Sequence, residues 1–185
     1  FVHNLEAFCS PFYHPMAQGV ALEGMKLVHD NLPQACADGS DIVARSNMLA
    51  ASIMGATAFQ KGLGGVHALS HPIGAVFDTH HGLANAIMLP YVLVRNQAAI
   101  EQRLSDAARY IGLQDASFKG FLDWILRLRA DLNIPHSLAE IGIDESRAEE
   151  IGAAAKQDPS DGGNPVNLMP ADYTAIFIAA VKGVV

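Results

Sequence analysis

The chain has 185 residues, of which 50% are hydrophobic and 17% are charged. A chain of this length and composition can bury a core of its own, which excludes an intrinsically disordered segment and a disulfide-stapled miniprotein. Twelve Lys and Arg residues against 19 Asp and Glu give a formal net charge of -7, so neither nucleic acid nor an anionic membrane surface is an expected partner.

Apolar residues recur at spacings of three and four along nearly the whole chain, and the two-residue alternation of a half-buried strand is hard to find. Glycine and proline, with 16 and 9 residues, punctuate these segments. The sequence therefore predicts an all-α fold with a single domain over residues 1–185. The predicted helices, in chain order, are Val2–Cys9, Pro15–Ala37, Asp41–Lys61, Gly65–Phe77, Gly82–Asn96, Ile100–Ile111, Phe118–Leu132, Asp144–Gln157 and Ala171–Lys182.

Cysteine spacing and hydropathy indicate the cellular location that we expect for the chain. Cys9 and Cys36 are too far apart for a C-x-x-C metal or redox site, which favours a reducing, cytoplasmic location. The longest apolar stretch, Ala86 to Val94, is about half as long as a bilayer span and contains Pro90, so no membrane span is expected. Because the chain opens on Phe1 without an initiator Met, we expect it to be cut from a longer protein.

The nucleotide-binding motifs are missing. Neither G-x-G-x-x-G after a strand nor G-x-x-x-x-G-K-[ST] occurs, and the run that begins at Gly62-Leu63-Gly64 lacks the third glycine. This chain alone therefore offers no recognisable cradle for the phosphates of a cofactor.

Histidines are the residues that point to chemistry. Four of the eight lie between positions 67 and 81, and His67 and His71 are four apart on a predicted helix, so both rings project from one face. Neutral imidazole is the commonest metal-ligating side chain, which makes this cluster a candidate metal or catalytic site. A zincin would need Glu directly after the first histidine, whereas Ala68 stands there. Further candidate ligands are His3 and His14, although His14 precedes Pro15 and also suits a helix entry.

The run Gly62 to Gly74 (GLGGVHALSHPIG) and the run Asp78 to Ala86 (DTHHGLANA), followed by Leu89-Pro90, resemble the signature of the iron-containing (group III) alcohol dehydrogenases. The N-terminal segment Phe1 to Phe8 is similar to the first metal-binding helix of that family, and Gly163-Asn164-Pro165 is similar to its closing Asn-Pro-Arg region, with Val166 in place of Arg. The resemblance covers only the helical, metal-binding half of a family member. A nucleotide-binding α/β domain would precede it.

Carried over residue by residue, the resemblance implies that His3, His67 and His81 are metal ligands. A fourth ligand, an Asp four positions before His3, would lie outside this chain. His71 matches a histidine near the nicotinamide and the substrate that relays a proton or positions the cofactor. The family usually has Pro where this chain has His80, so His80 remains an alternative to His81, which keeps the family spacing.

The implied activity is oxidation of a small alcohol, or reduction of an aldehyde, by hydride exchange with NAD or NADP at a divalent metal, Fe²⁺ or alternatively Zn²⁺. The chain by itself is expected to be inactive, and the full enzyme to be a homo-oligomer. Two alternatives stay open. One is a related carbonyl reductase acting on a lactaldehyde, a semialdehyde or maleylacetate, although Gly82 to Asn85 departs from the maleylacetate type. The other is a non-catalytic helical metal-binding module.

Overall fold

The computed structural model describes all residues from 1 to 185 and contains only helices, turns and loops, which confirms the all-α prediction. The α-helices are α1 (Val2–Cys9), α2 (Pro15–Ala37), α3 (Ile42–Ala58), α4 (Gly65–Phe77), α5 (His81–Ile111), α6 (Phe118–Asp131), α7 (Ala148–Gln157) and α8 (Pro170–Lys182). Four short 3-10 helices join them: η1 (Phe59–Lys61), η2 (Ala139–Ile141), η3 (Glu145–Arg147) and η4 (Pro159–Gly163).

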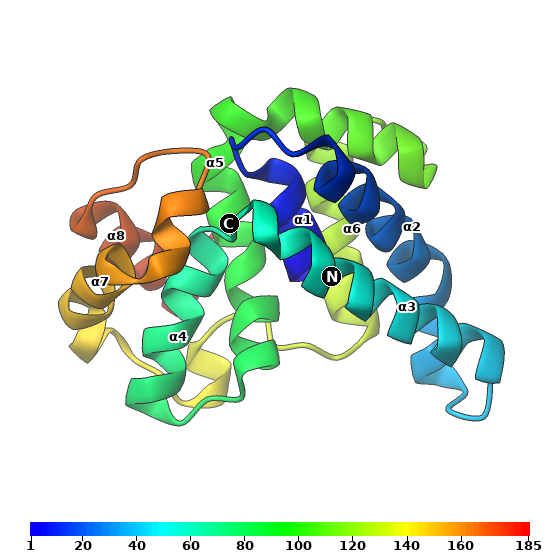
Figure 1. The fold of residues 1–185 in the computed structure, drawn as a ribbon. Coiled ribbons are helices and arrows are strands. Elements are labelled where there is room, and N and C mark those ends of the chain that lie inside the picture. Colours follow the sequence, from blue (N-terminus) through cyan, green and yellow to red (C-terminus); the bar gives the residue numbers. More distant parts are fainter.

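The long helix α5 is the axis of the molecule. It contacts α1, α2, α4, α6 and α8. Figure 1 shows the pair α2 and α3 at one end of the molecule and the pair α7 and α8 at the other, with α1 and α4 between them. The N-terminal helix α1 is enclosed by α2, α3 and α5, so a residue on α1 can meet residues that lie far along the sequence.

Helix α5 corrects the prediction of two separate helices, Gly82–Asn96 and Ile100–Ile111. The first of these two helices was predicted to end at Asn96, but the side chain of Asn96 is buried on the core face of one continuous helix. Its amide exchanges two hydrogen bonds with the amide of Asn164, at 2.8 and 3.0 Å. Because a distant residue satisfies Asn96, its amide does not compete for the local backbone and the helix continues.

Side chains set several of the helix starts. Asp41 precedes α3 and its carboxylate accepts the N–H of Ala44, and the Ser117 hydroxyl accepts the N–H of Gly120 at the start of α6. The predicted helix from Asp144 instead begins as the 3-10 helix η3, because the Asp144 carboxylate accepts the N–H of Ser146, only two residues on. The α-helical part, α7, starts at Ala148.

A single cluster of 39 buried apolar residues joins the helices into one core. Helix α3 takes little part in that core: Ile42, Val43, Leu49 and Ile53 are exposed on it. By length and composition alone, the stretch Ile42–Lys61 is long and apolar enough to cross a membrane, although the sequence pattern had predicted no membrane span. In the structure this stretch packs along α2.

Two glycines bring the C-terminal loop against the start of α4. Gly62 has a φ of 126°, a conformation that glycine adopts without strain. A Cβ atom on Gly163 would stand 2.0 Å from the carbonyl oxygen of Leu63. This close approach places η4, and Asp158 directly before it, beside the helix that carries His67 and His71.

Candidate metal centre

Four histidines from three helices lie together. His3 is on α1, His67 and His71 are on α4, and His81 is the first residue of α5. The ring of His3 stacks on that of His67 with centroids 4.7 Å apart, and the centroid of the His81 ring is 5.3 Å from that of His67. The three residues that the resemblance implies as ligands therefore meet, although they are up to 78 positions apart in the sequence.

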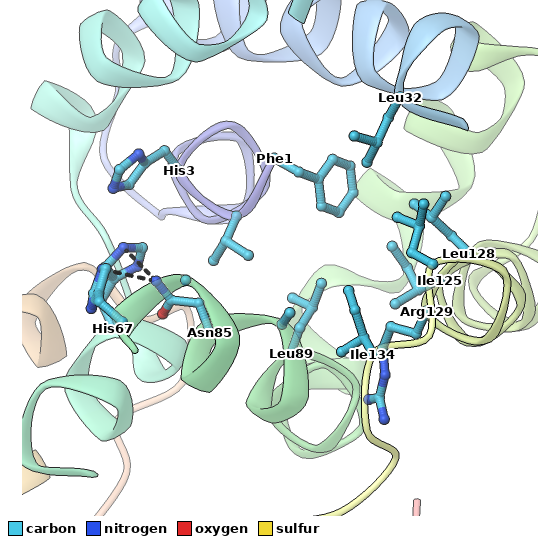
Figure 2. Close-up of a pocket in the computed structure, with 15 residues that line it drawn as sticks. Phe1, His3, Leu32, His67, Asn85, Leu89, Ile125, Leu128, Arg129 and Ile134 are labelled. Atoms are coloured by element: carbon cyan, nitrogen blue, oxygen red, sulfur yellow. Dashed lines mark hydrogen bonds between the residues drawn. The ribbon is translucent and has the colours of Figure 1, made fainter. Parts of the chain in front are cut away.

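Two ring nitrogens point to the same place. Nδ1 of His67 is 2.5 Å from Oε2 of Glu6, which leaves Nε2 of His67 free. The side-chain amide nitrogen of Asn85 lies 2.9 Å from Nε2 of His81 and 3.4 Å from Nε2 of His67, as the dashed lines in Figure 2 show. The amide nitrogen of Asn85 is thus near the Nε2 atoms of both rings, and the Oδ1 atom of Asn85 is buried without a partner.

Burial favours the neutral form of two of these rings, His3 and His81. Burial lowers the pKa of His3 to about 4, with smaller contributions from His67, the N-terminal amine and His81. Burial also lowers the pKa of His81, and the neighbouring histidines add to the effect. Neutral imidazole is the form that ligates a metal, so the lowered pKa values of His3 and His81 favour the protonation state that a ligand needs.

The imidazole nitrogens of His3, His67 and His81 are suitable ligands for a divalent cation, and two of them already lie close to one common point. Imidazole nitrogens suit both Fe²⁺ and Zn²⁺, and the Nε2 atoms of His67 and His81 already share one polar hydrogen donor. The side chains are not arranged as a finished site, because no group of three or more His, Cys, Asp or Glu residues has the geometry that holds a metal ion.

His71 has a carboxylate partner of its own. Its side chain is 45% exposed, and its Nδ1 lies 2.8 Å from Oδ2 of Asp158. Burial raises the pKa of Asp158, but hydrogen bonds from Ser160 and His71 outweigh this and lower it overall. A charged carboxylate therefore holds Nδ1 of His71, while the ring of His71 stacks on that of His81 with centroids 5.3 Å apart.

The remaining histidine candidates lie elsewhere. Nδ1 of His14 accepts the N–H of Ala17 at 3.1 Å and caps α2, so His14 is a helix-entry residue in the structure. His80 is the residue before α5, and it is His81 whose ring contacts His67 and His71.

A cavity of about 310 Å³ extends from the histidines between α1, α5 and α6. Figure 2 shows His3, His67 and Asn85 on one side of it and apolar side chains such as Leu128 and Ile134 on the other. Burial lowers the pKa of the Phe1 amino group, and Phe1 lines the cavity.

Sequence reasoning did not assign a role to Glu6, Asn85 or Asp158. Glu6 follows His3 by three residues and Asn85 follows His81 by four, so helical spacing alone places each on the face of its histidine. Asp158 gives no comparable signal, because it lies 87 positions from His71. Only the folded chain brings the two together.

Known proteins are similar to this chain over nearly its whole length. Positions 1–181 match the model of the Fe-containing alcohol dehydrogenase family, C-terminal. The chain is 35% identical to 4-hydroxybutyrate dehydrogenase of Cupriavidus necator, covering 92% of this chain and 47% of that protein. It is 34% identical to 1,3-propanediol dehydrogenase of Citrobacter freundii, covering 95% of this chain and 47% of that protein.

Solved structures of the same family have a similar fold. A crystal structure of 1,3-propanediol oxidoreductase superposes with a TM-score of 0.93 at 33% identity, over 97% of this chain and 49% of that one. Maleylacetate reductase from Rhizobium sp. superposes with a TM-score of 0.81 at 25% identity, over 98% and 50% of the two chains. The chain spans about half the length of the relatives that it matches and belongs to the Fe-containing alcohol dehydrogenase family, as its C-terminal domain.

Proposed function

We propose that this chain is the metal-binding half of an NAD(P)-dependent alcohol dehydrogenase, with His3, His67 and His81 as ligands of a divalent cation. The observation that carries the proposal is that three histidine side chains from three helices meet in a member of this family, and that burial lowers the pKa of two of them, His3 and His81. Fe²⁺ is the proposed metal, and Zn²⁺ is the alternative that the same donors accept. A carboxylate ligand, a nucleotide-binding α/β domain and the contacts of a homo-oligomer would come from the rest of the protein.

A bound cation would act as a Lewis acid on the oxygen of a small alcohol or aldehyde, while hydride passes between the substrate and NAD(P). The residues of this chain would orient the histidine rings and transfer a proton. Glu6 holds Nδ1 of His67, and Asp158 holds Nδ1 of His71. Because a carboxylate only accepts hydrogen bonds, Nδ1 of His71 carries the proton and its Nε2 is the basic atom, ready to take the proton of a substrate hydroxyl.

A second candidate substrate class is favoured by the 35% identity to 4-hydroxybutyrate dehydrogenase. An enzyme of this class would act on a hydroxy acid or its semialdehyde instead of a neutral diol. Rates with 4-hydroxybutyrate and with 1,3-propanediol, measured on the protein at the full length of its relatives, separate the two substrate classes.

The test of the proposed site compares His81→Ala with His71→Ala in that longer protein. His81→Ala should lose the metal, measured by elemental analysis after dialysis, and lose activity with it. His71→Ala should keep the metal but slow alcohol turnover by about 100-fold, because a general acid–base contributes at least that much.

Loss of metal in both variants would contradict the assignment and place His71 among the ligands. Metal binding without any NAD(P)-dependent turnover in the longer protein would instead favour a non-catalytic metal-binding module.

A further inference from the structure

Glu6 is a buried carboxylate with an unusual set of partners. Its side chain on α1 is 8% exposed, and neither lysine nor arginine forms an ion pair with it. Both of its oxygens are used: Oε2 lies 2.5 Å from Nδ1 of His67, and Oε1 accepts the backbone N–H of Val66 at 2.7 Å. Burying a carboxylate is costly unless hydrogen bonds satisfy it, and here both bonds come from the first turn of α4.

The local backbone is shaped to admit this carboxylate. A Cβ atom on Gly64, the residue before α4, would lie 3.1 Å from Oε1 of Glu6, closer than most side chains allow. The neighbouring N–H of Gly65 is accepted by the side chain of Asn164 at 3.0 Å. Two side chains from distant parts of the sequence therefore satisfy the first amides of α4, and only Glu6 also reaches the His67 ring.

The contact with Nδ1 decides which nitrogen of His67 carries the proton. An ionised carboxylate has no hydrogen to donate, so His67 must donate from Nδ1 and keep its lone pair on Nε2. Nε2 is the atom that faces Asn85 and shares that amide with His81. The far nitrogen of a metal-ligating histidine is commonly held in this way, and the partner sets both the tautomer and the orientation of the ring.

We propose that Glu6 is a positioning residue of the metal centre: it fixes His67 as the tautomer whose Nε2 can ligate, and it ties α1, which carries His3, to α4, which carries His67. This role rests on the proposed metal site. Glu6 touches neither substrate nor metal, and it acts through His67.

Glu6→Gln is the sharp test, because a glutamine has the same shape but only one accepting oxygen. If that oxygen serves Val66, the amide group faces Nδ1 of His67 and forces the proton onto Nε2. If the oxygen serves His67, the amide group meets the N–H of Val66, donor against donor. Either way one of the two bonds is lost, and the affinity of the protein at the full length of its relatives for Zn²⁺ or Co²⁺ should fall by about 10- to 100-fold.

The tautomer itself is read from ¹⁵N–¹H correlations of the His67 ring in the metal-free chain. The wild-type chain should show the proton on Nδ1, and this measurement needs no variant, so it decides the matter even if Glu6→Gln does not fold. Asn164→Ala is the matched control, since it removes the other acceptor from the first turn of α4 without touching a histidine. It should lower stability but leave the proton on Nδ1 and metal affinity within about twofold of the wild type.

A wild-type proton on Nε2, or equal metal affinity in the wild type and Glu6→Gln, would overturn the role of Glu6 alone. An Asn164→Ala variant that loses as much affinity as Glu6→Gln would reduce Glu6 to general support of the helix, and would also overturn it. A wild-type protein at the full length of its relatives that binds neither Zn²⁺ nor Co²⁺ would overturn the metal centre itself, and this role with it.

Discussion

His3 shows how the surroundings of one residue set its chemistry. Its ring is half-buried, stacked on His67 and close to Phe59. Burial lowers its pKa from the ordinary 6.5 to about 4, whereas in the unfolded chain the ordinary value applies. The folded chain therefore binds a proton at His3 less readily than the unfolded chain, and protons favour unfolding.

This linkage predicts a loss of stability in mild acid. Between pH 6.5 and about 4 the unfolded chain takes up a proton at His3 that the folded chain refuses, so the free energy of unfolding falls as the pH falls through this window. Above it both states are neutral and His3 contributes no pH dependence. The effect should be on the order of 1 kcal/mol, since solvent screens a half-exposed ring.

Urea unfolding of the metal-free chain at several pH values measures this pH dependence of the free energy of unfolding. His3→Gln should flatten the curve between pH 6.5 and 4 relative to the wild type, while the acid transitions of Asp and Glu remain in both. Identical slopes in the two proteins would show that His3 titrates normally in the folded state.

The residues of the site were predictable to different degrees. His67, His71 and His81 lie close together in the sequence, whereas His3 was one of several further candidates until the resemblance of the N-terminal helix implied that it is a ligand. The orientation of the rings could not be predicted from the sequence. It depends on contacts with Glu6, Asn85 and Asp158, and most of these join residues that are far apart in the sequence. A sequence shows which side chains can ligate, but the tautomer of each imidazole follows from partners that only packing supplies.

At the scale of elements, α1 is held at its C-terminal end by two cations. The ammonium group of Lys61, which is buried in η1, donates to the carbonyl oxygens of Ala7, Phe8 and Ser10 at 2.8 to 3.2 Å. Nη1 of Arg103 on α5 also donates to the carbonyls of Phe8 and Ser10. The C-terminal end of a helix carries partial negative charge, so both cations are well placed, and they fix the helix that carries His3 and Glu6.

Lys61→Met should therefore destabilise the chain. Methionine fills similar space but leaves the carbonyl of Ala7 without its donor, and an unsatisfied buried acceptor costs about 1–3 kcal/mol. Denaturant unfolding at pH 7 measures the loss. Burial, with the nearby charge of Arg103, lowers the pKa of Lys61 to about 8, so the wild-type amine is still mainly charged at that pH.

Lys26→Met is the matched control, because Lys26 is a more exposed lysine paired with Asp30 one turn away on α2. Its effect should stay within about 0.5 kcal/mol, as exposed ion pairs contribute little. If Lys61→Met were as harmless as Lys26→Met, the clamp on α1 would be energetically unimportant.

The helices themselves follow closely from local pattern. The bounds predicted for α1, α2 and α4 are those observed, because glycine, proline and polar residues lie at their ends. The prediction failed at α5, where one helix was predicted to end at Asn96, although Asn164 satisfies the Asn96 side chain from 68 positions away and the helix continues. The partners of Lys61 lie more than 50 positions away, so local pattern could not reveal that this polar residue would be buried.

On the scale of the whole molecule, the site exists only where α1, α4 and α5 meet. Each of these helices is packed into the same core cluster, so folding of this half alone should bring the histidines together. The chemistry of the proposed reaction needs more than that. Hydride exchange requires a bound nicotinamide cofactor, and the relatives carry a further half of similar length that this chain does not cover.

The 185-residue chain should therefore fold without catalysing the reaction. Circular dichroism should show a helical protein with a cooperative thermal transition, while NAD(P)-linked oxidation of 1,3-propanediol or 4-hydroxybutyrate should stay at background with Fe²⁺ or Zn²⁺ added. The folded signal matters, because it separates a missing nucleotide site from a misfolded chain. The same assay on the protein at the length of its relatives is the positive control. Turnover by the isolated chain would mean that its own helices bind the cofactor, and the proposed division of labour between the two halves would be wrong.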